Sequence, residues 1–582
     1  MKLLFVNLDF MNGLRKKENL YFFISSILFL VVYYKFDISL GFNPTDEGRN
    51  FAYIEKILNG KVPHKDFLHI HFIGSTILHL YQELIPEYNI QISRIQSSIF
   101  ILFYTYVFLY LHPFFHKYNI FVKNILLISV SIINFHIFPL FSWPTVDGIF
   151  IFALFLYLEK KIESKYSKYT YLLLGFLPLF KFGFLLLIPV IFIRNIIFRK
   201  NIKLKNQIIN FLISLIPIIT YVAVIAIFGG MKDIVDLITS VSVQTTIYFD
   251  SLGLTSVMWL YNTFFVFTIL QILIKKRFFS LGILTILIYI FVLEIRYFNN
   301  LGSLEINKPH IFLLVSIFLL FNFYNKKFKN YKDDFELFFL LLSIEAVSIL
   351  SFGWRLSQWV YGSLLVSLLM TLSRVYQTTE YSKKINRKIF LNIQTSLIII
   401  TVLFVSIVNI QDRDKYNYRD LDNEFLIYNL NEVNRKFGNI YTNKSTYTYM
   451  ENLHNCIEPL NNKNIHIFPD NSILYFLLDL KNPLPLNWHE GIREETSLDN
   501  LKTVEKIKEL NYGDFPFYIV LQDNFATNLK TTKLEELNKF TGIKNFENSD
   551  KKNIIEIYKN SFIYESNICK NYEIVKVVGK SK

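Results

Sequence analysis

Long apolar runs, separated by short basic segments, dominate the first 410 residues of the chain. Most of the runs are about 18 to 22 residues long, which is enough for an α-helix to cross the hydrocarbon core of a bilayer. We count about thirteen of them and expect each to form a helix. The runs cover residues 20–37, 93–111, 121–141, 148–159, 170–180, 182–198, 207–229, 257–274, 279–295, 308–324, 334–352, 359–376 and 389–410.

The basic segments between these runs predict the topology. Lys and Arg concentrate in "HKYNIFVKN", "EKKIESKYSK", "IFRKNIKLKN", "KKR", "NKKFKNYK" and "SKKINRK", which fall on alternate sides if the cytoplasmic loops are basic. Residues 170–198 must then form a hairpin of two short helices, with Lys181 at its outer turn, because both of its flanks are basic. The first run follows Arg15, Lys16 and Lys17 and lacks a small-residue cleavage site, so we expect a retained helix and a cytoplasmic N-terminus.

The chain changes character after residue 410. Long apolar runs end, and short β-like pieces, "NIHIFPD" and "FPFYIVLQD", alternate with helix-like stretches such as "SLDNLKTVEKIKEL". We expect a compact extracytoplasmic α/β domain over residues 411–582. The predicted fold class is therefore an α-helical polytopic membrane protein, with about 11–13 transmembrane helices in residues 1–410 and this C-terminal domain. Cys456 and Cys569 both lie in the domain, and the sequence leaves their pairing open.

Composition agrees with the membrane prediction and excludes one class of partner. The apolar fraction is 52%, the aromatic fraction is 17% and the mean hydropathy is +0.32, all above the norm for soluble proteins. The net charge is +14, but the basic excess is confined to residues 1–410. It is therefore a topology signal, and we expect membrane lipids around the chain and no nucleic-acid partner.

The first external loop, residues 38–92, carries the most informative polar stretch, "NPTDEGRNFAYIEKILNGKVPHKDF". Its pattern predicts a short amphipathic helix that begins near Thr45 or Asp46 and ends at Gly60. Asp46 and Glu47 are explained either as a cap that complements the helix dipole or as a carboxylate pair at the lipid boundary. In the second case a partly desolvated carboxylate is placed to act as a general base on a membrane-bound substrate.

This loop resembles the first external loop of the GT-C glycosyltransferase superfamily, in its protein-mannosyltransferase and aminoarabinose-transferase-like branch. Members carry an Asp-Glu pair after the first span, then an Arg or aromatic residue, and then a "Pro-Tyr-x-Asp-Phe"-like piece. These features are matched here by Asp46 and Glu47, by Arg49, and by "PHKDF" with Asp66. The resemblance implies that Asp46 is the catalytic base, with Glu47 beside it.

Further matches follow in the order that the family shows. Asp147 in "FSWPTVDGIF" stands where relatives have a second external acidic residue, and Lys181 in "LPLFKFGFLLLIP" stands where they have a basic residue in a short hairpin. Arg94 in "ISRIQSSIF" is a weaker match, and "NIHIFPDNSILYFLLDLKNPLP" resembles the family's outer domain. One departure is "HIHFIGST", where many relatives have a His-Pro-Pro or Lys-Pro-Pro sequence that contacts the donor phosphate.

The resemblance implies transfer of a sugar, with inversion, from a polyprenyl-phosphate donor to a hydroxyl of a lipid, glycan or protein on the outer face of the cytoplasmic membrane. The leaving phosphate needs positive charge nearby but no proton. Candidate cations for this role are Arg49, Arg94, Lys181, Arg296 and Arg355. We expect no cofactor and no metal, because His64, His69 and His71 form only a weak ligand pattern.

Other functions remain open from the sequence. A transporter or flippase usually places charges or Gly and Pro breaks at mid-membrane, whereas the charges here fall at the ends of the runs. A polysaccharide polymerase or ligase would use similar chemistry and would be expected to carry Arg-rich outer loops. A non-catalytic membrane assembly protein would show no donor turnover.

Overall fold

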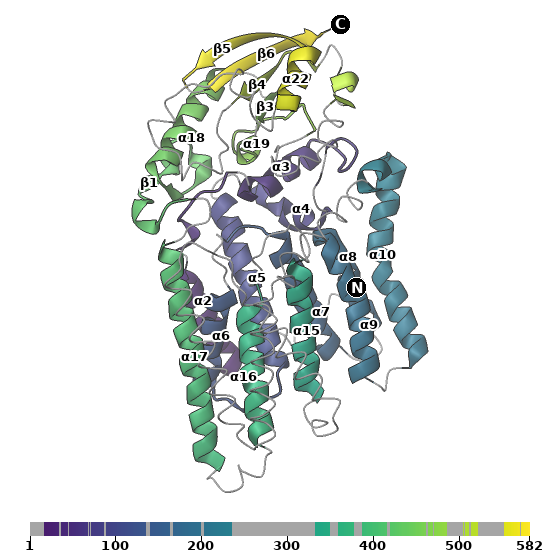
Figure 1. Ribbon diagram of the computed structural model, residues 1–582, viewed down its shortest axis with the longest axis vertical. Helices are drawn as coiled ribbons and strands as arrows, with labels where there is room; N and C mark the ends of the chain where they lie inside the picture. The colour runs from purple at the N-terminus through teal and green to yellow at the C-terminus, as the bar shows by residue number, and fades with distance from the viewer. Residues whose placement is uncertain are drawn as a thin grey trace, which may run out of the picture.

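The computed structural model describes the following parts of the 582-residue chain. They are residues 17–33, 37–44, 46–67, 69, 72–85, 89–134, 140–162, 167–199, 203–235, 332–349, 359–377, 387–415, 420–460, 464–468, 471–485, 504–505, 507–510, 514–521, 552–570 and 572–581. The described part consists of a helical bundle with a small α/β region stacked on one of its ends (Figure 1).

The bundle contains a helix at every expected apolar run that lies within the described residues. Its helices are α2 (Lys17–Tyr33), α5 (Asn89–Leu111), α6 (Ile120–Asn134), α7 (Pro144–Lys161), α8 (Ser167–Phe180), α9 (Leu187–Phe198), α10 (Leu204–Phe228), α15 (Lys332–Ile349), α16 (Tyr361–Gln377) and α17 (Arg387–Lys415). Short 3-10 turns are η3 (Phe115–Lys117) and η4 (Phe182–Leu186). The expected runs 257–274, 279–295 and 308–324 lie outside the described residues.

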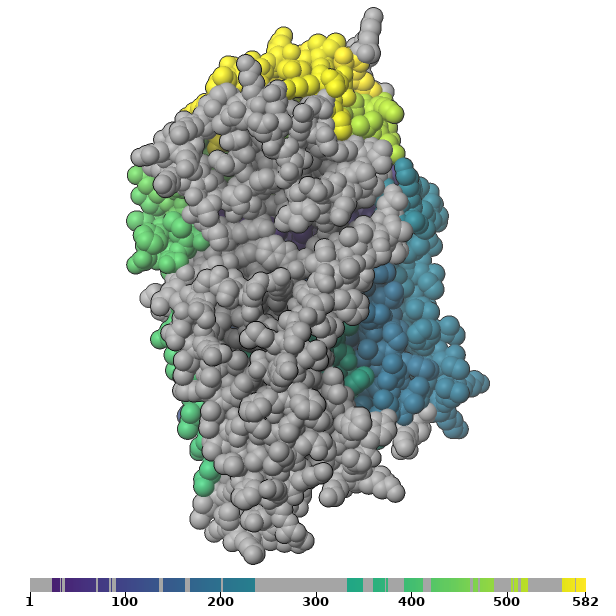
Figure 2. Space-filling view, viewed as in Figure 1, coloured from purple at the N-terminus to yellow at the C-terminus, as the bar shows by residue number. Residues whose placement is uncertain are grey.

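Three helices among the described residues are long and apolar enough to cross a membrane. They are Ile90–Leu111, Leu204–Phe228 and Asn392–Gln411. The second of these, in α10, runs along the edge of the bundle, and its surface is visible at the right of the molecule (Figures 1 and 2). Large aliphatic side chains are exposed along it, including Leu212, Ile219 and Ile227. Such a continuous apolar surface is typical of a helix that faces lipid.

The interior of the bundle is one continuous apolar cluster. It joins α5, α6, α7 and α8 with α15 and α16, and its fully buried members include Ile101, Phe152, Leu177 and Leu341. Close helix contacts depend on small residues: a Cβ on Gly175 of α8 would lie 2.1 Å from the carbonyl oxygen of Ser214 in α10. Side-chain packing of this kind, rather than the hydrophobic effect, holds helices together in lipid.

The described part of residues 38–92, the loop that the sequence predicts to be external, forms a layer between the bundle and the α/β region (Figure 1). It contains α3 (Asp46–Leu58), α4 (Gly74–His79) and the 3-10 turn η2 (Leu80–Leu84). The expected amphipathic helix at Asp46 is thus confirmed. Gly60, just beyond its end, has φ +77°, a left-handed backbone conformation that glycine adopts readily.

The α/β region begins with small elements. They are η7 (Asn423–Phe425), β1 (Tyr428–Asn429), η8 (Leu430–Glu432), η9 (Arg435–Phe437), β2 (Tyr441–Thr442), α18 (Lys444–Ile457) and η10 (Glu458–Leu460). The main sheet has four strands in the order β3-β4-β6-β5. Its elements are β3 (Ile465–Phe468), α19 (Ile473–Leu477), β4 (Phe517–Leu521), α22 (Lys552–Ser561), β5 (Phe562–Cys569) and β6 (Tyr572–Lys580).

The pairing within this sheet is mixed. Strand β3 runs parallel to β4, whereas β6 is antiparallel to both β4 and β5. The "NIHIFPD" and "FPFYIVLQD" segments form β3 and β4, so both short strands expected from the sequence are confirmed. The β5–β6 hairpin and α22 lie at the end of the α/β region away from the bundle, at the top of the molecule (Figures 1 and 2).

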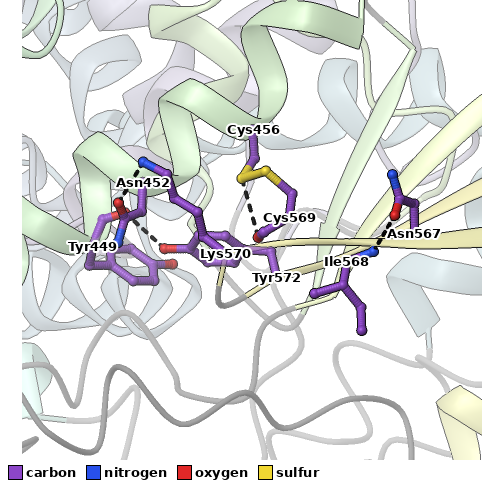
Figure 3. Close-up of a disulfide and its surroundings, with 8 residues drawn as sticks. All are labelled: Tyr449, Asn452, Cys456, Asn567, Ile568, Cys569, Lys570 and Tyr572. Carbon is purple, nitrogen blue, oxygen red and sulfur yellow. Dashed lines mark hydrogen bonds between the residues drawn. A yellow bond between two sulfur atoms is a disulfide. The ribbon is translucent and has the colours of Figure 1, made fainter.

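A disulfide joins Cys456 at the end of α18 to Cys569 at the end of β5 (Figure 3). Beside it, the hydroxyl of Tyr572 donates to the carbonyl oxygen of Tyr449 at 2.8 Å. The sequence had left this pairing open. The bond closes a loop of 113 residues, and such a constraint disfavours the unfolded state.

The loop of residues 38–92 and the α/β region share one apolar core. A single apolar cluster contains Phe42, Phe51 and Ile54 of this loop together with α/β-region residues such as Leu453 and Ile473. The expected domain boundary at residue 410 is therefore crossed by continuous packing between this loop and the α/β region.

Candidate functional site

The side chain of Asn43 caps helix α3. Its Oδ1 accepts a hydrogen bond from the backbone amide of Asp46 at 3.1 Å, and its Nδ2 donates to Oδ2 of Asp46 at 3.2 Å. The capping group is therefore Asn43 rather than Thr45 or Asp46 as expected from the sequence. Because Asn43 satisfies the helix start, the carboxylate of Asp46 is not needed as the cap.

Glu47, the second member of the pair, is locked to Arg94 of α5. The Nε and Nη2 atoms of Arg94 each donate to one oxygen of Glu47 at 2.8 Å, and both side chains are almost fully buried. Burial raises the pKa of Glu47 above its usual value, while Arg94 and the backbone amide of Asn43 act in the opposite direction.

Arg94 has no hydrogen-bond donor left for a ligand. Nη1 donates to the carbonyl oxygens of Ile38 at 2.8 Å and Leu40 at 3.1 Å, and Nη2 also donates to that of Gly41 at 2.8 Å. With the two bonds to Glu47, all five guanidinium donors are used within the protein. The arrangement fixes the start of the external loop and orients α3.

Asp46 lies in the first turn of α3, next to Glu47, with 7% of its surface exposed. One turn further on, Nδ2 of Asn50 donates to the carbonyl oxygen of Ser142 at 2.8 Å and to its Oγ at 3.1 Å. Ser142 lies two residues before the start of α7. The helix that carries Asp46 is therefore fixed to the end of the bundle at which α7 begins.

The α/β region holds the other side of α3. Helix α19 packs so closely against it that a Cβ on Gly48 would lie 2.1 Å from the backbone nitrogen of Ile473. Ile473 also donates its amide to the carbonyl oxygen of Pro44 at 3.1 Å. At the far end of α3, Nζ of the buried Lys56 donates to the carbonyl oxygen of Leu484 at 2.8 Å.

A second link joins the α/β region to the loop before α3. The buried carboxylate of Asp420 accepts from the backbone amide of Phe42 at 2.9 Å, and from the side chains of Thr442 and Asn443. Burial raises the pKa of Asp420, which these hydrogen bonds partly oppose. The loop that bears Asp46 is thus anchored on both faces.

Lys181 occupies the expected turn, between α8 and η4. It is 4% exposed, and its Nζ donates to Oγ1 of Thr145 at 3.3 Å and to the carbonyl oxygen of Ser348 in α15. No carboxylate of the described residues forms an ion pair with it. A buried ammonium without a counter-charge is costly, so this side chain gains stability either by losing its proton or by meeting an anion.

Asp147 lies on the first turn of the same helix as Thr145 and is fully buried. Nε2 of His79 is 3.1 Å from its Oδ2, and Nδ1 of His79 is 2.9 Å from Nε2 of Gln82. Because the Gln82 amide donates, His79 accepts at Nδ1 and carries its proton on Nε2, facing Asp147. Asp147 is therefore part of a His–carboxylate pair that the sequence did not predict.

The remaining predicted residues are spread more widely. Arg49 is buried on α3. Asp66 accepts from the backbone amide of Val62 at 2.7 Å and so shapes the loop after α3. His69 contacts Oγ1 of Thr76 at 3.0 Å and stacks on Tyr53. Arg296, Arg355 and His71 lie outside the described residues.

The described residues contain no group of three His, Cys, Asp or Glu side chains arranged to hold a metal ion. What they do bring together is a polar end of the bundle. Asp46, Glu47 and Arg94 form one group around the start of α3. Asp147 and Thr145, the partners of His79 and Lys181, both lie on the first turn of α7.

Several residues of this site gave no signal in the sequence. His79, Asn50 and Lys56 sit in ordinary helical patterns, and their partners lie 68, 92 and 428 residues away along the chain. Asn43 stands just before the expected helix in the quoted stretch, but it was not predicted to be the cap. Comparisons with protein-family models, with curated proteins and with solved structures gave no match.

Proposed function

We propose that the chain is a multi-pass membrane glycosyltransferase with about 11–13 spans. It would move a sugar from a polyprenyl-phosphate donor to a hydroxyl group on the outer face of the membrane. The observation that supports the proposal is that the helix carrying Asp46 and the side chain of the buried Lys181 both contact the segment 142–145, where α7 begins. Asp46 lies on a helix fixed to Ser142, and Lys181 binds Thr145 three residues further along the chain.

The chemistry assigns one task to each of these two groups. Asp46 accepts the proton of the acceptor hydroxyl while that oxygen attacks the anomeric carbon. The bond between the anomeric carbon and the phosphate oxygen breaks, and the polyprenyl phosphate leaves as an anion. Lys181 stabilises this anion, so the leaving group needs no proton. Attack from the face opposite to the phosphate inverts the configuration of the sugar.

Glu47 and Arg94 serve this reaction by position. Their ion pair holds the start of α3, and the links from α19 and Asp420 hold its outer side. A base that is fixed in this way needs little reorganisation when the acceptor arrives. The proposal specifies the acceptor only by its hydroxyl group, which a lipid, a glycan or a protein can supply.

The proposal is tested with purified protein in lipid nanodiscs and a panel of polyprenyl-phosphate sugars. Mass spectrometry follows the release of polyprenyl phosphate. We expect turnover of at least one donor, and a higher KM for that donor in Lys181→Met, because the variant keeps the apolar stem and removes the charge.

Lys65→Met is the matched control, since Lys65 is an exposed lysine of the same external loop. Its KM should equal that of the parent protein. If the parent released no phosphate from any donor, or if Lys181→Met left the KM unchanged, the proposal would fail. If a donor is turned over, comparison of envelope glycans with and without the gene identifies the sugar that is transferred in the cell.

A further inference from the structure

A cavity of about 740 Å³ opens at the opposite end of the bundle. It lies among the last turns of α7 and α9 and the first turns of α15, and Glu159, Arg194 and Glu336 line it. Glu159 follows Asp147 by twelve residues on α7, which corresponds to about 18 Å along the helix axis. The cavity is therefore separate from the site around Asp46 and does not depend on the function proposed for it.

Two arginines and two glutamates form a closed group on its wall. Nη2 of Arg194 donates to both oxygens of Glu159 at 2.9 Å, and its Nε lies 3.2 Å from Glu336. Arg199 contacts Glu159 at 3.1 Å and Glu336 at 3.0 Å. The charges of these four side chains balance one another. The group also ties α7, α9 and α15 together at this end.

Arg194 has one terminal nitrogen, Nη1, whose two N–H donors the group does not use. The residue is fully buried, and no hydrogen-bond partner of its Nη1 exists in the part of the chain that the structure describes. Buried polar groups are nearly always hydrogen-bonded. Because Arg194 lines the cavity, its unsatisfied Nη1 is the candidate donor for a ligand bound there. Arginine donors favour phosphate and carboxylate oxygens.

Two lysines add charge to the same cavity. Lys160 of α7 and Lys332 of α15 line it and are exposed, and Asp333 is the one further carboxylate among its lining residues. The lining therefore carries one more basic than acidic side chain. Since the four charges of the Arg–Glu group cancel, this excess comes from the two lysines, which can approach an anion from the open side.

We propose that this cavity binds a phosphate group carried by an anionic ligand, with Arg194 as the buried donor and with Lys160 and Lys332 at the entrance. In a membrane, helix ends of this kind lie at the level of the lipid headgroups, where basic pockets between helices bind anionic lipids. The phosphate can belong to such a lipid or to a soluble molecule. The two sources share the same contacts and are separated by the experiment.

The experiment uses the full chain in detergent. Phosphatidylglycerol, phosphatidylcholine, inorganic phosphate and glycerol 1-phosphate are titrated separately, and the thermal midpoint and the lipids retained in native mass spectrometry are measured. Phosphatidylcholine is the lipid control, because its choline cancels the charge of its phosphate. Binding by phosphatidylglycerol alone identifies a lipid source, and equal binding of glycerol 1-phosphate identifies a soluble one.

The chain offers a matched pair of lysines for the variants. Lys160 and Lys161 are neighbours, and both approach the ring of Tyr110, at 5.2 Å and 5.3 Å, but only Lys160 lines the cavity. We expect Lys160→Ala combined with Lys332→Ala to weaken anion binding about tenfold or more. The single variant Lys161→Ala, in which Lys160 and Lys332 are both kept, should bind the anion as tightly as the parent protein does.

Two results would overturn the proposal. The first is that none of the anionic probes binds the parent better than phosphatidylcholine does. The second is that Lys161→Ala loses as much affinity as the Lys160→Ala, Lys332→Ala variant, because the effect would then be general surface charge. Both variants change exposed side chains, so neither is expected to prevent folding.

Discussion

Arg94 holds Glu47 in a bidentate ion pair, with both nitrogen–oxygen distances at 2.8 Å and with neither side chain reaching solvent to any extent. The pair joins α5 of the bundle to α3 of the external loop. The three carbonyl groups that Arg94 also binds belong to the segment just before α3. The acidic pair of the loop is therefore divided in its roles, because Glu47 is bound by the scaffold and Asp46 is the member at the helix start.

This division predicts strong coupling between Glu47 and Arg94. Arg94→Met leaves a buried carboxylate unpaired, and we expect it to lower the free energy of unfolding by about 3–5 kcal/mol. The double variant with Glu47→Leu should cost less than the two single changes together, with a coupling of roughly 0.5–3 kcal/mol. Denaturation of the purified variants measures the cycle. Additive losses would show that the ion pair does not couple the two positions.

The close approach of α19 to Gly48 predicts that even a methyl group at this position destabilises the contact between α3 and the α/β region. A methyl group at this position would collide with backbone atoms of Ile473, so Gly48→Ala must displace α19. We expect a loss of about 1–3 kcal/mol in stability, together with faster proteolysis of the α/β region. Leu58→Ala, on the exposed part of the same helix, is the control and should change stability by less than about 0.5 kcal/mol. Equal stability of the two variants would contradict the contact.

His466 of β3 predicts an acid-sensitive α/β region. Its Nδ1 lies 3.0 Å from Oδ1 of Asn482 and its Nε2 lies 3.1 Å from the hydroxyl of Tyr558. Burial lowers its pKa to about 3, and Lys56 acts in the same direction. The unfolded chain, with a His pKa of about 6.5, then binds more protons than the folded chain between pH 6.5 and pH 3.

Stability should therefore fall as the pH drops through this window, by about 1.4 kcal/mol for each pH unit from this one residue. His466→Gln cannot take up a proton and keeps a donor and an acceptor, so its stability should fall less steeply. Denaturant unfolding of both proteins at pH 7, 6, 5 and 4 gives the two slopes. Parallel slopes would remove His466 as the cause.

The disulfide predicts a redox dependence of the same region. Removing the link between Cys456 and Cys569 frees a loop of 113 residues, and we expect a loss of about 2–5 kcal/mol. A reductant should lower the thermal midpoint of the parent protein and leave the Cys456→Ser, Cys569→Ser variant unchanged. If the reductant acted equally on both, the effect would not come from this bond.

The sequence predicted the helices well because continuous apolar runs of this length strongly favour helices. Every expected run among the described residues is helical, and the start of α3 falls at Asp46 as expected. Forming a helix and crossing a membrane are different properties, because crossing also requires a sufficient apolar length and depends on the surrounding lipid. Three helices of the described part reach that length and apolarity.

The contacts that build the site were not predictable from the sequence. The amide of Phe42 meets Asp420 across 378 residues, and Asp147 meets His79 across 68. Local periodicity tells which face of a helix is buried, but not which distant side chain it meets. The different roles of Asp46 and Glu47 were not predictable for the same reason, since they depend on the position of Arg94 in the folded chain.

The central claim is that Asp46 is the base of the transfer reaction, and Asp46→Asn tests it most directly. The asparagine keeps the size of the side chain and still accepts from Nδ2 of Asn43, but it cannot take up the proton of the acceptor. Glu55→Gln, the same change of carboxylate to amide on the same helix, is the control. We expect Asp46→Asn to lower sugar transfer roughly 10²–10⁴-fold in a folded protein, and Glu55→Gln to leave it unchanged. Near-normal transfer by a well-folded Asp46→Asn protein would contradict the account.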